Sequence, residues 1–277
     1  MGWLEAVVLG AVQGLTEFLP VSSTAHLSLV GRLFFGGHDP GASFSAVIQL
    51  GTNLAVLLYF WGDIVRIVKA WALSLVGKVP RSDPDARLGW FVILGSIPIG
   101  VLGLLFQNQI ETSLRNLWVT VAMLAGVGVV LWIADRYAAT HSTKTIDTLT
   151  LPDAIVYGLC QATALIPGVS RSGGTIAGGL FLGYTRAAAA RYSFLLSLPA
   201  IWISGLYQLK GLDTAGVTWG PTIVATLIAF VVGFAVIAWL LRFISTHDFR
   251  PFVIYRWALA LAVAGLLLGG VLAPVGT

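Results

Sequence analysis

Two stretches of this chain repeat one another and decide how the rest of it is arranged. Residues 9–23 read LGAVQGLTEFLPVSS, and residues 157–172 read YGLCQATALIPGVSRS. They match at a glycine, at a glutamine and, after one gap, at a proline that precedes a serine pair or SRS. The matched positions are Gly10 with Gly158, Gln13 with Gln161, and Pro20 with Pro167. Chance similarity of apolar segments is the alternative, but the polar matches favour an internal repeat at a spacing of about 148 residues.

The composition excludes most soluble classes of protein. Of the 277 residues, 57% are hydrophobic and only 10% are charged, whereas roughly 25% of the residues in soluble domains are charged. Mean hydropathy is +0.88. Disordered chains, nucleic-acid-binding tails and disulfide scaffolds are disfavoured, and the single cysteine, Cys160, has no internal partner for a disulfide bond. We expect a membrane protein that contacts lipid and has no nucleic-acid partner.

Six stretches fit helices that cross a bilayer, which requires about 20 mainly apolar residues for about 30 Å of hydrocarbon. They are, approximately, residues 44–61, 89–106, 117–134, 192–209, 222–241 and 252–273. Only the last contains a charged residue, Arg256, which is near enough to one end to extend its charge to the membrane surface. The sequence therefore predicts an all-α polytopic membrane protein with six transmembrane helices.

Two further regions, residues 3–36 and 152–184, are apolar but interrupted by Gly, Pro and polar residues. We interpret them as re-entrant helical hairpins, because a broken backbone is tolerated in a membrane only where protein or a cavity covers it. Residues 1–140 and 150–277 then form two repeats of one membrane domain, each with a hairpin and three crossings. Since three is odd, the second repeat is inverted, and the hairpins enter from opposite faces and meet near the midplane.

Positive charges set the orientation, because cytoplasmic loops are enriched in Lys and Arg. We place the segment from Gly62 to Leu88 in the cytoplasm. Alternation of the crossings then gives this side Arg66, Lys69, Lys78, Arg81, Arg87, Arg136, Lys144, Arg186, Arg191, Arg242 and Arg250. The outer side receives Arg32, Arg115, Lys210 and both termini. The chain has no positive residue before Arg32, so a cleaved signal peptide is not expected.

Ionisable groups at membrane depth are costly and are therefore candidates for function. The first hairpin holds such a group at Glu17 and at His26, and its polar neighbours are Gln13, Ser22, Ser23 and Thr24. Gln13 and Glu17 are four residues apart and share a helix face. Pro20 ends that helix and can start the next. In the new helix Ser22 and Ser23 precede His26 by four and three residues, so we expect at least one hydroxyl on the face of the imidazole.

The second hairpin has the features of an anion site. Residues 167–175 read PGVSRSGGT, in which small residues allow close approach of the backbone to a ligand. A helix that begins here offers unpaired N–H groups to an anion, and Arg171 adds a planar cation suited to phosphate oxygens. The candidate ligands of the phosphate are Arg171, Ser170, Ser172, Gly173 and Thr175, together with Ser22 and Thr24 of the first hairpin.

Together the hairpins supply a set of groups that fits phosphoryl transfer, in which catalysis is mostly positioning and neutralisation of charge. Glu17 and Gln13 are the candidate ligands of a divalent metal ion, Mg²⁺ or Ca²⁺, which prefer oxygen ligands. Either Ser23 or a water molecule attacks phosphorus, with His26 as general base or acid. The residues alone do not choose between these two nucleophiles.

Structural roles compete with each of these assignments. Glu17 could be a carboxyl that stays protonated between helices, His26 could bond only a nearby carbonyl, and Ser22 and Ser23 could be ordinary helix caps. Arg171 could serve only to satisfy backbone carbonyls of the opposite hairpin. Gln49 and Asn53, four residues apart in the first crossing, either line the site or bond between helices.

The two motifs resemble those of a known family, the bacitracin-resistance type undecaprenyl-diphosphate phosphatases. The matching pieces are QGLTEFLPVSSTAH from Gln13 to His26 and PGVSRSGGT from Pro167 to Thr175, and the resemblance covers essentially the whole chain. The family takes Glu or Gln at the position of Gln13, so the glutamine is a permitted variant, although it removes one carboxylate from a metal site.

The resemblance implies that the protein hydrolyses the C55 isoprenyl diphosphate to its monophosphate with the aid of a divalent metal ion. It also implies that the site opens to the outer face of the bacterial cell membrane. This reaction recycles the lipid carrier of cell-wall synthesis and confers resistance to bacitracin. The resemblance also implies an inverted-repeat fold with two re-entrant hairpins, often as a homodimer.

A transporter or lipid flippase is the competing function, because inverted repeats with broken helices are common in secondary carriers. Glu17 would then bind a proton or cation, and Arg171 would anchor the substrate. A channel is less favoured, since rings of charge typical of pores are absent from the sequence. Release of phosphate in detergent separates an enzyme from a carrier.

Overall fold

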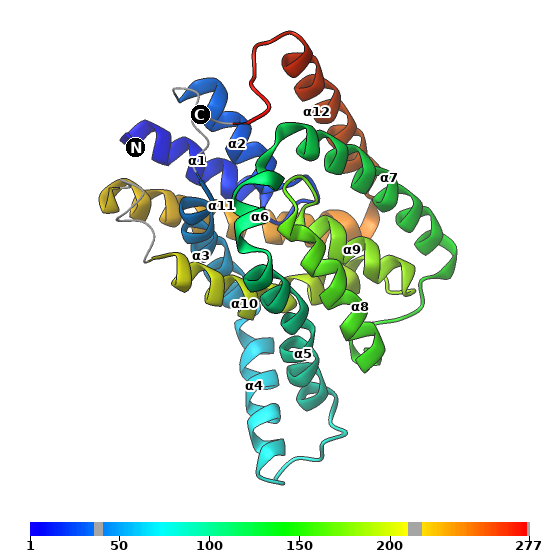
Figure 1. The fold of residues 1–277 in the computed structure, drawn as a ribbon. Coiled ribbons are helices and arrows are strands. Elements are labelled where there is room, and N and C mark those ends of the chain that lie inside the picture. Colours follow the sequence, from blue (N-terminus) through cyan, green and yellow to red (C-terminus); the bar gives the residue numbers. More distant parts are fainter. Residues whose placement is uncertain (36–40, 210–217, 276–277) are drawn as a thin grey trace.

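The computed structural model describes residues 1–35, 41–209 and 218–275, and the regular elements in those ranges are helices. Figure 1 shows their arrangement. In chain order they are α1 (Trp3–Thr16), α2 (Ser23–Phe34), α3 (Gly41–Tyr59), α4 (Trp61–Leu75), α5 (Pro84–Leu105), α6 (Gln107–Glu111), α7 (Leu117–His141), α8 (Leu151–Ala162), α9 (Arg171–Phe181), α10 (Arg186–Gln208), α11 (Trp219–Thr246) and α12 (Arg250–Leu268), with 3₁₀ turns at Ser113–Arg115, Ile146–Thr148 and Thr163–Leu165. Lys210 and the predicted end of the first hairpin at residue 36 lie outside the described residues.

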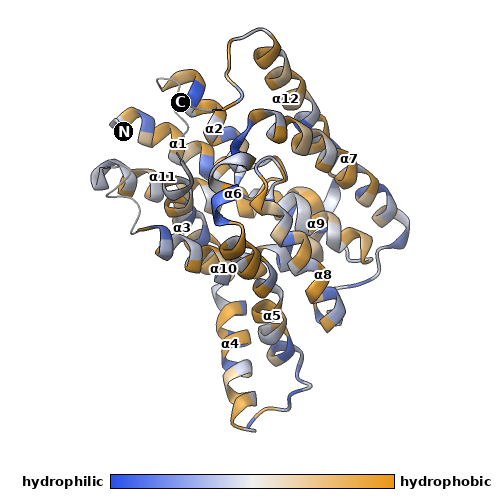
Figure 2. Ribbon diagram, in the orientation of Figure 1, coloured by the Kyte–Doolittle hydropathy of each residue, from blue (hydrophilic) through white to orange (hydrophobic). Residues whose placement is uncertain are grey.

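Several of these helices have the length and surface of membrane spans. Within the described ranges, α5, α7, α11 and α12 are each long and apolar enough to cross a bilayer. Helices α3 and α4 meet that description only together, across a bend of 80°, so the candidate spans number four or five. Large apolar side chains such as Leu104, Val231 and Leu261 lie exposed on these helices, and Figure 2 shows hydrophobic colouring along their lengths. Exposed apolar surface on this scale identifies a multi-pass membrane protein.

The predicted spans agree with the helices to different degrees. Four of them fall on α5, α7, α11 and α12. The predicted span 252–273 is too long, because α12 ends at Leu268 and residues 269–273 are not helical. The stretch 44–61 falls mainly on α3, and 192–209 falls on α10. Helix α10 is not among the helices of the described ranges that qualify as spans by length and composition. Most of its residues from Ala188 to Ser197 are buried, and a helix covered by protein does not need the apolar surface that lipid requires.

Each predicted hairpin is a pair of short helices with a break between them. The break between α1 and α2 contains Pro20, and the break between α8 and α9 contains Pro167. At both breaks the new helix starts after a serine with positive φ, 74° at Ser22 and 70° at Ser170. The Ser22 hydroxyl accepts a hydrogen bond from the N–H three residues ahead, at 3.4 Å, and the Ser170 hydroxyl does the same at 3.1 Å. The two related stretches therefore build the same strained cap.

The first helix of each pair packs against a helix from the other half of the chain, an arrangement called crosswise packing below. Helix α1 packs against α11 of the second half, and α8 packs against α5 of the first half. The matched glycines make both contacts possible: a Cβ added at Gly10 would overlap the carbonyl of Ala225, and one added at Gly158 would overlap the carbonyl of Gly95. The halves also meet where α3 packs on α10 and α7 packs on α12.

The sequence suggested that Arg256 extends its charge to the membrane surface, and the structure contradicts this. Its side chain is fully buried, and its guanidinium donates hydrogen bonds to the carbonyls of Leu124, Met123, Pro20 and Gly168 at 2.8 to 3.1 Å. Pro20 and Gly168 lie in the two breaks. The prediction failed because hydropathy places an Arg near a helix end at the surface, whereas here two carbonyls in the breaks and two of α7 satisfy the buried cation.

Candidate functional site

Glu17 is the centre of a polar cluster at the junction of the two helix pairs. It directly follows α1, and its side chain is only 3% exposed. One carboxylate oxygen, Oε1, accepts a hydrogen bond of 2.8 Å from Nη2 of Arg171. The other, Oε2, accepts bonds of 2.7 Å from the hydroxyl of Ser23 and 2.8 Å from the amide of Gln13. The structure therefore brings together four of the residues singled out in the sequence.

Ser23 and Arg171 reach Glu17 from equivalent positions. Each is the first residue of its helix, directly after the positive-φ serine cap. The N-termini of α2 and α9 consequently approach one carboxylate from the two hairpins. Helix N-termini favour negative charge, so this junction is an anion site that the carboxylate of Glu17 occupies and the Arg171 guanidinium reinforces.

Two buried polar atoms of this cluster have no hydrogen-bond partner among the described residues: Oε1 of Gln13 and Nη1 of Arg171. Such orphaned groups are rare in folded proteins and often mark the position of a ligand. The guanidinium donor suits an anionic oxygen, and the amide oxygen suits a cation. The cluster thus has one unused group of each kind.

The remaining residues of the second hairpin connect it to its surroundings. The Ser172 hydroxyl donates to the carbonyl of Leu19, at 3.0 Å, and lies 3.5 Å from that of Glu17, so it fixes the break of the first hairpin. Thr175 bonds the carbonyl of Arg171 and the hydroxyl of Ser193. Both side chains are fully buried. In this structure their hydroxyls hold the scaffold, and contact with substrate remains a prediction for them.

The polar residues around the two caps have local partners. The hydroxyls of Ser22 and Thr24 lie 3.1 Å apart, as do those of Ser170 and Ser172. The N–H of Gly173 donates to the Ser170 hydroxyl. These pairs show the repeat at atomic detail, and substrate binding by Ser22, Thr24, Ser170 and Gly173 stays a prediction.

His26 lies in α2 but does not bond the hydroxyl of Ser23. Its Nδ1 lies 2.7 Å from the carbonyl oxygen of Ser22, and its Nε2 lies 2.6 Å from the hydroxyl of Tyr255 in α12. Ser22 thus contacts the imidazole through its backbone carbonyl, and a part for a serine hydroxyl in the chemistry of His26 stays a prediction. Glu17, rather than His26, is in place to accept the proton of Ser23.

Sequence reasoning missed two contributors, Tyr255 and Arg256, which are adjacent in α12. Tyr255 contacts His26, and Arg256 bonds the carbonyls of Pro20 and Gly168. The only available signal was the presence of an Arg within an apolar stretch. Nothing in the local pattern indicates that a span 229 residues beyond His26 turns its tyrosine toward the first hairpin.

The residues partly fit a metal ion. Within the described ranges, no three His, Cys, Asp or Glu side chains gather as a metal site. Glu17 and Gln13 nevertheless lie side by side, and the amide oxygen of Gln13 is unpaired. Mg²⁺ commonly uses one or two carboxylates together with substrate phosphates rather than a complete protein cage. The donor set therefore suits a metal ion that binds together with a phosphorylated substrate.

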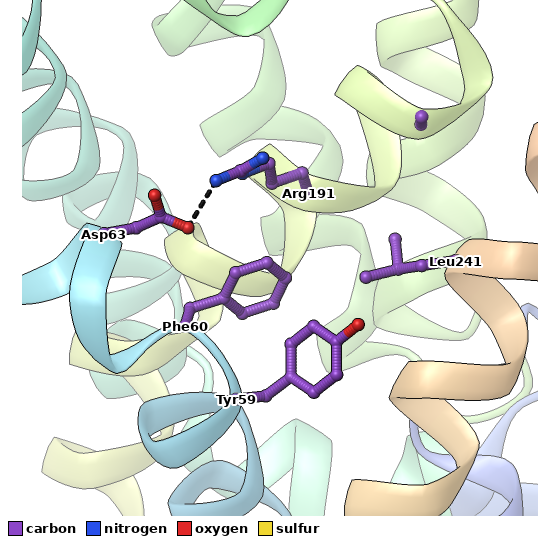
Figure 3. Close-up of a pocket in the computed structure, with 6 residues that line it drawn as sticks. Tyr59, Phe60, Asp63, Arg191 and Leu241 are labelled. Atoms are coloured by element: carbon purple, nitrogen blue, oxygen red, sulfur yellow. Dashed lines mark hydrogen bonds and ion pairs between the residues drawn. The ribbon is translucent and has the colours of Figure 1, made fainter.

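Two other polar features lie apart from the junction. A cavity of about 290 Å³ is lined by Tyr59, Phe60, Asp63, Ala187, Arg191 and Leu241. In Figure 3 the Arg191 guanidinium pairs with the Asp63 carboxylate there, so their charges cancel. Elsewhere, the Asn53 amide donates a hydrogen bond to the carbonyl of Leu198, 3.1 Å away, and so joins α3 to α10. Of the two roles considered for Asn53, the structure therefore shows the bond between helices.

Comparison with known proteins agrees with this geometry. The family model described as bacitracin resistance protein BacA matches residues 6–262. The chain is 56% identical to an undecaprenyl-diphosphatase of Micrococcus luteus, with 98% of this chain and 96% of the relative covered. It is 56% identical to undecaprenyl-diphosphatase 2 of Streptomyces coelicolor, with 99% and 98% covered, and 59% identical to the undecaprenyl-diphosphatase of Kineococcus radiotolerans, with 98% and 96% covered. With a matched family model and relatives of this identity along nearly its whole length, the chain belongs to the BacA family of bacitracin resistance proteins.

Proposed function

We propose that this protein hydrolyses undecaprenyl diphosphate to undecaprenyl phosphate and inorganic phosphate. The names of its relatives support this reaction. The observation that carries the proposal is the Glu17 carboxylate held between Ser23 of one hairpin and Arg171 of the other. An acid, a hydroxyl and a guanidinium then surround one anion site, as phosphoryl transfer requires.

The membrane arrangement proposed with this function has six crossings and two re-entrant hairpins in inverted repeats. The crosswise packing of α1 on α11 and of α8 on α5 supports it, as do the matched caps at Ser22 and Ser170. We further propose that the site opens to the outer face of the bacterial cell membrane, that the prenyl chain lies between helices in contact with lipid, and that two copies form a homodimer. Recycling of the lipid carrier for cell-wall synthesis and resistance to bacitracin follow from the reaction.

The first step of the proposed mechanism is an exchange of anions. The terminal phosphate replaces the Glu17 carboxylate at Arg171, whose second donor, Nη1, is already unpaired. The N-terminus of α9 and the guanidinium then bind the charge that develops on the phosphate oxygens. Glu17 is released from its ion pair but keeps its contact with Ser23.

The second step transfers the phosphoryl group. The Ser23 hydroxyl, 2.7 Å from Glu17, attacks the terminal phosphorus while Glu17 accepts its proton. The bond to the bridging oxygen breaks, undecaprenyl phosphate leaves, and water then hydrolyses the phosphoserine. Direct attack by water, with Ser23 as a hydrogen-bonding partner, is the alternative. A bound divalent ion, held by Glu17 and Gln13, would neutralise phosphate charge.

Purified protein in detergent tests the proposal. We expect it to release inorganic phosphate from C55 and C15 prenyl diphosphates, to lose this activity with EDTA, and to regain it with Mg²⁺ or Ca²⁺. Trapping of a phosphorylated enzyme in wild type and not in Ser23→Ala would favour the serine nucleophile. Wild-type protein that is folded, supplied with metal and still inactive would contradict the phosphatase assignment.

Lipid transport is the second candidate, because the crosswise packing of two broken helix pairs is an arrangement that carriers share. A carrier would release no phosphate in detergent but would move a labelled prenyl phosphate across a vesicle membrane. The same purified protein, assayed in both ways, distinguishes the two functions.

A further inference from the structure

The contact between His26 and Tyr255 assigns a role to a residue outside both motifs. The Tyr255 hydroxyl lies 2.6 Å from Nε2 of His26, and the two rings are nearly parallel, with 6° between their planes and 5.5 Å between their centroids. Tyr255 belongs to α12, whereas His26 belongs to α2. The imidazole is thus held at one ring nitrogen, by a nearly coplanar tyrosine, from a helix of the other half of the chain.

The partners of the two ring nitrogens fix the tautomer of the neutral imidazole. The group near Nδ1 is the carbonyl oxygen of Ser22, which can only accept a hydrogen bond, so Nδ1 carries the proton. The lone pair of the neutral ring is therefore on Nε2, and the Tyr255 hydroxyl donates to it. Without that hydroxyl, Nε2 would have no partner from the described residues.

Tyr255 is itself well placed to hold this geometry. Its neighbour Arg256 anchors α12 to the breaks of both hairpins through the carbonyls of Pro20 and Gly168. His26 is 9% exposed, whereas Tyr255 is 46% exposed, so the hydroxyl lies between the buried ring nitrogen and the surroundings of the protein.

We propose that Tyr255 is a positioning residue that acts through His26. It holds the imidazole in the Nδ1-protonated tautomer by donating the hydrogen bond of its hydroxyl to Nε2. The kinetic part of this inference rests on the proposed phosphatase function, whereas the tautomer can be measured without any activity.

The kinetic test is a double-mutant cycle. Tyr255→Phe keeps the aromatic ring and removes only the hydroxyl, and we expect kcat to fall about tenfold, the effect of one hydrogen bond on a rate, with KM unchanged. In a His26→Ala background the same substitution should change the residual rate by less than about twofold, because residues that act as a unit are not additive. Tyr137→Phe is the matched control, since Tyr137 stacks on His141 away from the site.

The second readout is the ¹⁵N spectrum of protein labelled in its histidines, with the His26 signals identified by their loss in His26→Ala. We expect a protonated Nδ1 and an unprotonated Nε2 in wild type, and a shifted Nε2 signal in Tyr255→Phe. A wild-type rate in Tyr255→Phe, an equal loss with and without His26, or an unmoved Nε2 signal would each overturn the proposal. Inactive wild-type protein with the expected spectra would contradict the phosphatase function alone.

Discussion

The two hairpins are built alike but present different side chains to Glu17. Both place a positive-φ serine before a helix, and in both the next residue reaches Glu17. That next residue is a hydroxyl in the first hairpin, Ser23, and a cation in the second, Arg171. The position of His26 corresponds to Gly174 in the second hairpin, so only the first carries an imidazole. The same backbone arrangement thus presents a hydroxyl to Glu17 on one side and a guanidinium on the other, and in the proposed mechanism these act as nucleophile and charge clamp.

A single side chain joins the two breaks, and its loss should have the largest effect. Arg256→Ala removes four hydrogen bonds to carbonyls and leaves two of those acceptors, the carbonyls of Pro20 and Gly168 in the breaks, without this partner. We expect a loss of stability of several kcal/mol, since each such group costs about 1–3 kcal/mol. Thermal unfolding in detergent measures it.

The control for Arg256→Ala is Arg250→Ala, in which an exposed side chain of the same helix is lost. An Arg256→Ala protein that unfolds at the temperature of wild type would show that the breaks hold together without this residue.

The next largest effect belongs to the charge clamp. Arg171→Ala should lower the rate of phosphate release by on the order of 10³, comparable to the loss of an oxyanion-hole donor. Arg136→Ala, which removes an exposed cation that stacks on Trp132, should leave the rate unchanged. Equal rates for the two variants would mean that the second hairpin does not bind the phosphate.

We expect the two adjacent serines of the first hairpin to differ in role, with Ser23 affecting the rate and Ser22 the stability. Ser23→Ala removes the hydroxyl that donates to Glu17, and we expect a loss of rate of about 10² or more. Ser22→Ala removes only the cap, and should cost about 1 kcal/mol of stability with a modest effect on rate. Ser170→Ala should match Ser22→Ala. If Ser22→Ala were the more damaging to the rate, the assignment of the two roles would be reversed.

The last set of effects concerns stability alone and the packing of the two hairpins. Gly10→Ala and Gly158→Ala place a methyl group against the carbonyls of Ala225 and Gly95, and each should destabilise the protein by about 1–3 kcal/mol. Gly126→Ala, at a position with open space around it, is the control. Similar losses at the two matched glycines would support the repeat, and a loss at only one would contradict it.

The sequence was informative where the signal is local. Apolar length predicts the helical membrane class, and Pro20 and Pro167 mark the breaks. The side chains of Glu17 and Arg171, 154 residues apart, were expected to face one another, because two interrupted segments in inverted repeats have to meet. That contact is present at 2.8 Å.

The features that the sequence did not reveal depend on tertiary contacts. The 80° bend between α3 and α4 has no proline or glycine at Phe60, where it occurs. Most residues of α10 from Ala188 to Ser197 are covered by protein, and Arg256 is buried where two distant breaks and α7 supply carbonyls. Each of these follows from neighbours that hydropathy along the chain does not report.

The most direct test of the account is an experimental structure of the protein with a prenyl methylene-bisphosphonate, a diphosphate analogue that cannot be cleaved. We predict that the Glu17–Arg171 ion pair opens, that the terminal phosphonate binds the Arg171 guanidinium at the start of α9, and that Ser23 faces its phosphorus. An analogue bound elsewhere, with that ion pair intact, would contradict the claim that the two hairpins together bind one diphosphate.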